Sequence, residues 1–115
     1  MGLLQSILGG NKDFNLDPDT FAELIVVDKE AVLIDVRTKE EYIETRIPKS
    51  ILMDIYQPDF FDKIDKLDKS KNYYLYCRSG NRSGYAVTEM KKMGFDNVFH
   101  LRNGIISWDG DVENG

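Results

Sequence analysis

Short apolar runs that alternate with helix-like segments constrain the fold of this chain most strongly. Three of them, AVLIDV (31–36), NYYLYC (72–77) and NVFHL (97–101), are rich in branched or aromatic residues. Runs of this length and composition are typical of strands that are buried on both faces of a sheet. SILMDI (50–55) has the same character and predicts a further strand.

The segments between these runs carry the start signals of helices. Asp17 and Pro18 fit the N-cap and the first position of one helix. Thr38 and Glu41 have the spacing of a capping box, in which two side chains satisfy the N–H groups of a helix start. We therefore expect helices to begin directly after residues 17 and 38.

Two later segments each have one apolar helical face. Residues 83–94 end in two lysines and Gly94, which is a helix stop signal. Residues 58–70 mix charges with an apolar face of Phe60, Phe61, Ile64 and Leu67. Strands that alternate with helices predict the α/β class, with a mainly parallel sheet and helices on both faces.

Length and charge restrict the number of domains and the kinds of partner. With 115 residues, of which 42% are hydrophobic and 30% charged, the chain fits one globular domain. We predict a leader over residues 1–12, a single domain over 13–110 and a tail over 111–115. The net charge of −5 argues against a nucleic-acid partner, because neutralising phosphates needs a basic surface.

The sequence predicts neither a membrane span nor an oxidising compartment. It has no run of about 18 apolar residues, and residues 1–12 lack the basic start of a secretory signal. Gly2 and Ser6 match the N-myristoylation pattern, but an ordinary leader is the simpler interpretation of so short a match. One cysteine cannot form an internal disulfide, so we expect a reduced, cytoplasmic protein without membrane association.

The stretch YLYCRSGNRSG (74–84) holds the only cysteine, Cys77, at the end of a predicted buried strand. Ligands of parallel α/β folds bind at the carboxyl ends of strands. Gly80 and Gly84 allow backbone N–H groups to turn inward, and the next helix directs its positive end to the same point. Residues 78–92 contain four basic residues and one acidic residue, so an acidic chain is locally basic at its thiol.

These surroundings favour the thiolate form of Cys77, because positive charge and N–H donors stabilise it. A thiolate is the nucleophile that sulfur and phosphoryl transfer require. The alternative is an inert cysteine that packs at a strand end. That alternative leaves the two arginines and two glycines of the next seven positions unexplained. We therefore predict that Cys77 is catalytic or binds a ligand.

The sequence resembles the single-domain rhodanese-like sulfurtransferases over nearly its whole length. The matching segments are LIDVRTKEEYIETRIPKSILMDI (33–55), YLYCRSGNRS (74–83), MGFDNVFHLRNGIISW (93–108) and, more weakly, FNLDPDTFAELI (14–25). The resemblance implies a rhodanese-like fold with a central, mainly parallel five-stranded sheet and helices on both faces. It also implies that Cys77 accepts a sulfane sulfur as a persulfide and passes it on.

The position of the second arginine separates two chemistries. Cysteine phosphatases, including the dual-specificity kind with the same fold, carry an arginine six positions after the cysteine, where this chain has Ser83. Here Arg82 comes five positions after Cys77. The shorter loop resembles the sulfurtransferase pattern, so a cysteine phosphatase is the less favoured alternative.

In the mechanism that the resemblance implies, catalytic Cys77 attacks the outer sulfur of thiosulfate or of a persulfide donor. We predict that the donor's anionic group binds to the loop residues Arg78, Ser79, Gly80, Asn81, Arg82 and Ser83. No metal or organic cofactor is required. Because the chain has no second cysteine, the sulfur must pass to an external acceptor, either cyanide in an assay or a thiol or dithiol protein.

Asp35 and Arg37 follow a neighbouring predicted strand, and we expect them to support the loop. A structural pair, of Arg37 with Glu41 or of Asp35 with backbone N–H groups, is favoured over a direct role in the pocket. His100 is the only histidine, so we do not expect a metal site. Trp108 is interpreted as an aromatic residue of the core or the rim.

Two stretches depart from the family's pattern. Residues 45–50 read Thr-Arg-Ile-Pro-Lys-Ser where the family has Gly-His-Ile-Pro-Gly-Ala, and Asn103 replaces the first of two glycines. Both stretches border the expected site, so they leave the donor and the docking partner open. A non-catalytic binding module of the same fold is the second functional alternative. Cys77 favours the enzyme, because a binding module needs no nucleophile.

Overall fold

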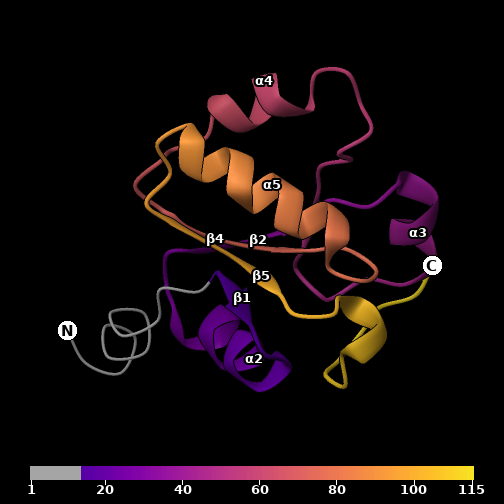
Figure 1. Cartoon of the computed structure of the whole chain (residues 1–115). Helices are drawn as coiled ribbons and strands as arrows, with labels where there is room; N and C mark the ends of the chain where they lie inside the picture. Colours follow the sequence, from indigo (N-terminus) through magenta and orange to yellow (C-terminus); the bar gives the residue numbers. More distant parts are fainter. Residues whose placement is uncertain (1–13) are drawn as a thin grey trace.

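One five-stranded sheet forms the centre of the molecule, in the order β1-β5-β4-β2-β3 with every neighbouring pair parallel (Figure 1). The computed structural model describes residues 14–115, so the predicted leader over residues 1–12 lies outside the described residues. The predicted α/β class and mainly parallel sheet are confirmed. The elements are β1 (Asn15–Leu16), α2 (Pro18–Val27), β2 (Ala31–Asp35), α3 (Lys39–Glu44), β3 (Ile51–Leu52), α4 (Phe60–Asp65), β4 (Asn72–Tyr76), α5 (Asn81–Lys92), β5 (Asn97–Leu101) and the 3-10 turn η1 (Ile105–Ser107).

Helices cover both faces of the sheet, α4 and α5 on one face and α2 with η1 on the other (Figure 1). The central strand β4 and its continuation serve both layers, because successive side chains point to opposite faces. Tyr73, Leu75 and Cys77 pack in the layer of α4 and α5, whereas Tyr74 and Tyr76 pack in the layer of α2. Cys77 therefore lies on the α5 side of the sheet.

The helix starts that the sequence predicts are confirmed. The side chain of Asp17 accepts a hydrogen bond of 2.8 Å from the Thr20 N–H group, and Pro18 opens α2. Thr38 and Glu41 form the expected capping box at the start of α3. These ends are local in sequence, so the residues that form them also determine them.

Two predicted elements are shorter than expected. The strand predicted over residues 50–55 is reduced to β3, which pairs only with β2 at the edge of the sheet. Beyond it the chain still runs beside β2, since the N–H groups of Met53 and Ile55 donate to the carbonyls of Asp35 and Val36. The helix expected within residues 58–70 ends at Asp65, where tighter turn bonds replace the helical pattern.

The helix α5 begins at Asn81, two residues earlier than its predicted start at residue 83. Gly80 precedes it with a φ of 102°, a left-handed conformation that glycine adopts at little cost. Only residues 78–80 therefore separate Cys77 from the helix. As a result, the first N–H groups of α5 lie directly at the cysteine.

Both departures from the family pattern lie at left-handed backbone positions. Lys49, at a position where the family has glycine, has a φ of 70°, and Asn103 has a φ of 63°. The substituted residues thus keep a conformation that favours glycine, at a cost of about 1 kcal/mol for lysine and less for asparagine. The predicted tail over residues 111–115 returns to the domain, because Glu113 and Arg46 exchange two backbone hydrogen bonds.

Candidate active site

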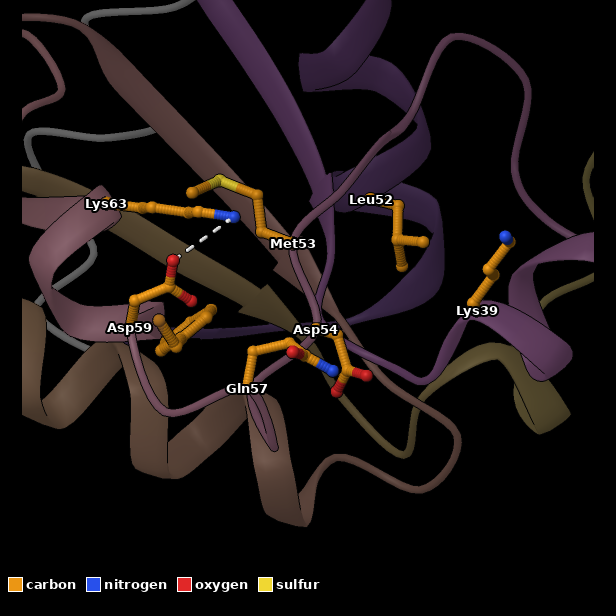
Figure 2. A pocket seen from close by; sticks show the side chains of 8 residues that line it. Lys39, Leu52, Met53, Asp54, Gln57, Asp59 and Lys63 are labelled. Atoms are coloured by element: carbon orange, nitrogen blue, oxygen red, sulfur yellow. Dashed lines mark ion pairs between the residues drawn. The ribbon is translucent and has the colours of Figure 1, made fainter.

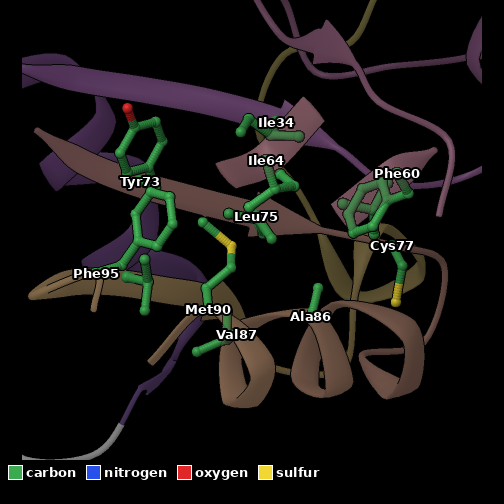
Figure 3. Close-up of a cluster of buried hydrophobic side chains, with 12 residues drawn as sticks. Ile34, Phe60, Ile64, Tyr73, Leu75, Cys77, Ala86, Val87, Met90 and Phe95 are labelled. Carbon is green, nitrogen blue, oxygen red and sulfur yellow. The ribbon is translucent and has the colours of Figure 1, made fainter. Parts of the chain in front are cut away.

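Cys77 follows the central strand β4, and its side chain has no exposed surface. Figure 3 shows it at one end of the buried cluster, with its sulfur directed toward α5. Its backbone is held as well, since the Cys77 carbonyl accepts a hydrogen bond of 2.9 Å from the Ile105 N–H group. The position of the sulfur is therefore set by strand, helix and turn together.

Hydrogen-bond donors surround the Cys77 sulfur. The N–H groups of Gly80 and Ser83 point at Sγ, with N–S distances of 3.1 and 3.3 Å. The Cys77 thiol in turn donates to the Ser83 hydroxyl oxygen at 3.4 Å, so the two N–H groups are the donors to the sulfur. These donors belong to the N-terminus of α5, where unpaired N–H groups and the helix dipole favour a negative charge. The arrangement stabilises an anionic sulfur.

The turn between β5 and η1 packs against the cysteine loop, the residues 78–83 that follow Cys77. A Cβ atom on Gly104 would clash with the carbonyl group of Arg78, so only glycine fits at this point. The Ile106 N–H group donates to the same carbonyl at 3.3 Å. The loop conformation thus depends on a segment that lies more than twenty residues further along the chain.

Arg82 is held by an acidic residue of another helix. Its guanidinium group binds the Glu41 carboxylate through two hydrogen bonds of 2.8 and 3.0 Å. These bonds to Arg82, together with those from Thr38, lower the pKa of Glu41 to about 2. The sequence pairs Glu41 only with Thr38 and, as one option, with Arg37. Glu41 is thus a site residue that the sequence analysis did not identify.

Arg37 and Asp35 form a second, fully buried pair. The Asp35 carboxylate accepts bonds from the Arg37 guanidinium at 2.6–3.1 Å and from the Arg37 backbone N–H group at 2.9 Å. Arg37 also donates to the Thr45 carbonyl at 2.6 Å and lies over the Tyr76 ring. Of the two predicted pairings, Asp35 with a backbone N–H group is present, whereas Glu41 binds Arg82 instead of Arg37.

Arg78 differs from both of these arginines. It is exposed, and among residues 14–115 its guanidinium forms no ion pair. It lines a hollow of about 230 Å³ together with Arg37, Glu41, Glu44, Thr45, Ile105, Ile106 and Val112. Ser79 and Asn81 are exposed on the same loop. Arg78 is therefore the arginine of the loop that can meet an incoming anion.

Of two further hollows, one lies beside the loop that follows Cys77 and the other does not. One of about 350 Å³ has Asn81 and Arg82 on its lining, beside the exposed rings of Tyr56 and Tyr85. Figure 2 shows the other, of about 230 Å³, whose lining includes Lys63 and Asp59, an ion pair of 3.5 Å. The lining of this second hollow includes no residue of the cysteine loop, so we do not assign it to the site.

His100 is a further neighbour of the loop that the sequence analysis did not place there. Its Nδ1 atom lies 3.0 Å from the hydroxyl oxygen of Ser83. β5 is hydrogen-bonded to β4 in parallel, with His100 opposite Leu75, which brings it beside the first turn of α5. The available signal was a polar residue among the apolar residues 98–101 of the strand.

The chain is similar to two proteins over most of their length and to part of a longer one. It is 37% identical over 91 residues to the Bacillus subtilis protein YtwF, covering 79% of this chain and 85% of that protein. A sulfurtransferase of Allochromatium vinosum is 27% identical over 93 residues, covering 81% of this chain and 85% of that protein. The adenylyltransferase and sulfurtransferase uba4 of Ogataea parapolymorpha is 29% identical, but the chain spans only 27% of its length.

Solved structures show the same fold. The rhodanese-related protein of Thermoplasma volcanium has a TM-score of 0.75 at 29% identity, covering 86% of this chain and 96% of that chain. The rhodanese-like domain protein of Staphylococcus aureus has a TM-score of 0.74 at 26% identity, covering 88% and 97%. The family model of the rhodanese-like domain matches residues 17–111. The chain therefore belongs to the rhodanese-like domain family.

Proposed function

We propose that this chain is a sulfurtransferase that carries a sulfane sulfur on Cys77 as a persulfide. The main support is the set of N–H donors from Gly80 and Ser83, which converge on one sulfur atom at 3.1 and 3.3 Å. Such donors stabilise the attacking thiolate and suit the anionic outer sulfur of a persulfide. A relative that covers a similar length, from Allochromatium vinosum, bears the name sulfurtransferase.

The first half-reaction transfers sulfur to the protein. The Cys77 thiolate attacks the outer sulfur of thiosulfate, a new S–S bond forms, and the bond to the sulfite group breaks. Its electron pair leaves with sulfite, so one thiolate and one dianion become one persulfide anion and one dianion. A thiol persulfide donor reacts in the same way and releases a thiolate. In both cases no external oxidant or reductant is consumed.

The second half-reaction returns Cys77 to the thiolate. An acceptor anion attacks the outer persulfide sulfur, and the electron pair of the breaking S–S bond stays on Cys77. With cyanide the product is thiocyanate, and with a thiol it is a new persulfide. The chain has only one cysteine, so the physiological acceptor is an external thiol or dithiol protein. We place this reaction in the cytoplasm, because the nucleophile must stay reduced.

Arg78 is the residue that meets the donor's anionic group in this proposal. Its guanidinium forms no ion pair among the described residues, and it lines a hollow beside the loop. Ser79 and Asn81 are exposed on the same loop, where their polar groups can meet the donor as well. Arg82 contributes less charge to the donor, because Glu41 neutralises it. No metal or organic cofactor has a part in the reaction.

The arrangement of Arg82 also weighs against a cysteine phosphatase. A phosphatase loop needs its arginine to bind the phosphoryl group that the cysteine attacks. Arg82 instead binds Glu41 through both of its terminal nitrogens. Turnover of an aryl phosphate that depends on Cys77 would contradict our assignment.

The proposal is tested by incubating the protein with thiosulfate and measuring its intact mass, with Cys77→Ser as the control. We expect the wild type to gain the mass of one sulfur atom and the variant to gain nothing. Addition of cyanide should then remove the added mass and release thiocyanate. If neither adduct nor thiocyanate forms with thiosulfate or with a glutathione persulfide donor, the enzymatic assignment is wrong and the non-catalytic binding module is favoured.

A further inference from the structure

A chain of three side chains leads away from the buried sulfur. Sγ of Cys77 lies 3.4 Å from Oγ of Ser83, and this Oγ lies 3.0 Å from Nδ1 of His100. The three residues come from three elements, the end of β4, the first turn of α5 and β5. Cys77 and Ser83 have no exposed surface, whereas His100 is partly exposed. The chain thus connects a buried thiol with the surface.

We propose that His100 is a positioning residue that takes up the Cys77 proton through the Ser83 hydroxyl. The inference rests on the proposed function, in which Cys77 must become a thiolate before it attacks. The Cys77 side chain is buried, so water removes its proton less readily than that of an exposed thiol. A serine hydroxyl can accept from an S–H group while it donates its own proton. Two acceptors lie near that proton, and Nδ1 of His100 at 3.0 Å is closer than the Gly80 carbonyl at 3.4 Å.

The proton transfer is balanced. Ser83 gives its hydroxyl proton to Nδ1 of His100 and receives the proton of the Cys77 thiol. The products are a thiolate, an unchanged hydroxyl and an imidazolium, which returns to neutral imidazole when it loses a proton to solvent. The thiolate keeps the N–H groups of Gly80 and Ser83 as donors, so the charge left on sulfur is stabilised where it forms.

Gly84 provides a second observation in favour of this arrangement. A Cβ atom at this position would lie 3.3 Å from Cε1 and 3.5 Å from Nε2 of His100. Glycine in a helix costs about 1 kcal/mol relative to alanine, so its place inside α5 needs a reason. The missing side chain lets the imidazole lie against the first turn of the helix, within reach of the Ser83 hydroxyl.

Several titratable or charged groups lie on the elements that pack around His100. β4 and its end contribute the Cys77 thiol. The basic residues of α5 have other partners, since Arg82 binds Glu41 and Lys91 lies over the Phe14 ring. β1 contains only Asn15 and Leu16, neither of them charged, and its neighbour Arg102 donates to the Asn15 carbonyl. Through the Ser83 hydroxyl, His100 is linked to the Cys77 thiol.

The test is the rate at which iodoacetamide alkylates Cys77, measured as a function of pH. It needs no sulfur donor, so it stays informative even if the proposed function fails. We expect the wild-type rate to rise with pH through an inflection that depends on His100. Ser83→Ala and His100→Leu should react about tenfold or more slowly near neutral pH and approach the wild-type rate in alkali, where hydroxide removes the proton directly.

His100→Asn separates proton uptake from hydrogen bonding. The asparagine amide oxygen can accept from Ser83, but it does not take up a proton in this range. We expect this variant to be as slow as His100→Leu and to lack the inflection. Thr88→Ala is the matched control, because it removes a hydroxyl one turn further along α5 that bonds only to the Gly84 carbonyl.

Two results would overturn the inference. One is a His100→Asn variant with the wild-type rate and inflection, which would reduce His100 to a hydrogen-bond acceptor. The other is an equal loss of rate in Thr88→Ala, which would indicate a general disturbance of the helix. Thermal unfolding of each variant, followed by circular dichroism, identifies a misfolded protein. Because asparagine is smaller and polar, His100→Asn keeps the test possible if His100→Leu does not fold.

Discussion

Two arginine–carboxylate pairs lie near the carboxyl edge of the sheet, and they differ mainly in their contact with water. The side chains of Asp35 and Arg37 are 0% and 4% exposed, whereas those of Glu41 and Arg82 are 28% and 20% exposed. The buried pair follows β2 and reaches the Thr45 carbonyl and the Tyr76 ring. The outer pair connects α3 with the cysteine loop. The two pairs form similar bonds, but the loss of one partner should have different energetic consequences in each.

The comparison shows how the same chemistry can hold a fold in one place and adjust a site in another. Removing one member of a buried pair leaves an uncompensated charge in a medium of low dielectric constant, which is strongly destabilising. Removing one member of the outer pair releases a charge that water can solvate. That released charge on Arg82 lies close to Cys77, so it changes the electrostatics around the sulfur. The first pair supports the site, and the second sets its charge.

The largest expected effect is on the buried pair. Asp35→Asn should lower the free energy of unfolding by about 3–5 kcal/mol, because it leaves the Arg37 guanidinium buried without its counter-charge. Urea unfolding followed by circular dichroism measures this change. The double variant Asp35→Leu with Arg37→Met should recover most of the loss. A single variant that loses less than about 1 kcal/mol would show that burial does not separate the two pairs.

The outer pair is tested through the rate of sulfur transfer. Glu41→Gln frees the Arg82 charge, so the rate of persulfide formation from dianionic thiosulfate should rise about fivefold to tenfold, equivalent to about 1 kcal/mol. The rate from a glutathione persulfide should change less. Glu40→Gln removes the same charge from the exposed neighbouring position and serves as the control. Equal increases in both variants would assign the effect to net charge and remove the special role of Glu41.

The outer pair should also make stability depend on acid. The folded-state pKa of Glu41 is lowered from 4.5 to about 2, chiefly by its bonds to Arg82. As the pH falls, Glu41 of the unfolded chain takes up a proton before Glu41 of the folded chain does. The stabilisation from this pair is therefore present above pH 4.5 and is lost as the pH falls toward 2. Partial exposure limits it to about 1 kcal/mol. Urea unfolding between about pH 5 and pH 3 should show a flatter dependence for Glu41→Gln than for the wild type.

The smallest effect is expected at an exposed pair outside the comparison. The side chains of Lys63 and Asp59 are 61% and 54% exposed, lie 3.5 Å apart and line the hollow in Figure 2. Lys63→Met should change the free energy of unfolding by less than about 0.5 kcal/mol, because water screens this pair. The same urea experiment at low and high salt measures it. A loss as large as that of Glu41→Gln would show that exposure does not order the three pairs.

The sequence predicts the parts of the fold that depend on neighbouring residues. The runs that form β4 and β5, and the caps at Asp17 and Thr38, could be identified because their signals are local. β1 could not, since Asn15 and Leu16 become a strand only through pairing with His100 and Leu101. Tertiary pairing, rather than an apolar pattern, makes this edge strand.

The start of α5 shows a second reason why local signals were insufficient. A serine is a common N-cap, which favours a helix that begins near Ser83. In the structure the Cys77 sulfur accepts the Ser83 N–H bond, while the residue at the cap, Gly80, has no side chain. Cys77 thus accepts the bond that an N-cap side chain usually accepts, although it lies three residues before the N-cap, Gly80.

The candidate site likewise has a part that is local in the sequence and a part that is not. The loop residues from Cys77 to Ser83 could be identified because they are consecutive in the sequence. Their partners could not, since Glu41 is 41 residues from Arg82 and His100 is 17 residues from Ser83. A parallel sheet places these partners at one edge without bringing them close in the chain. For this reason the charge of the loop was overestimated from its composition.

The bonds of the 3-10 turn to the cysteine loop have a consequence for biosynthesis. Among residues 14–115, the Cys77 and Arg78 carbonyls accept backbone bonds from the N–H groups of Ile105 and Ile106, and β1 pairs with β5. On the ribosome, the thiol emerges well before the residues that enclose it. Folding must wait for these distant contacts. Until those contacts form, the Cys77 thiol is less enclosed than in the fold, so the redox conditions during synthesis affect whether it reaches the folded state as a free thiol.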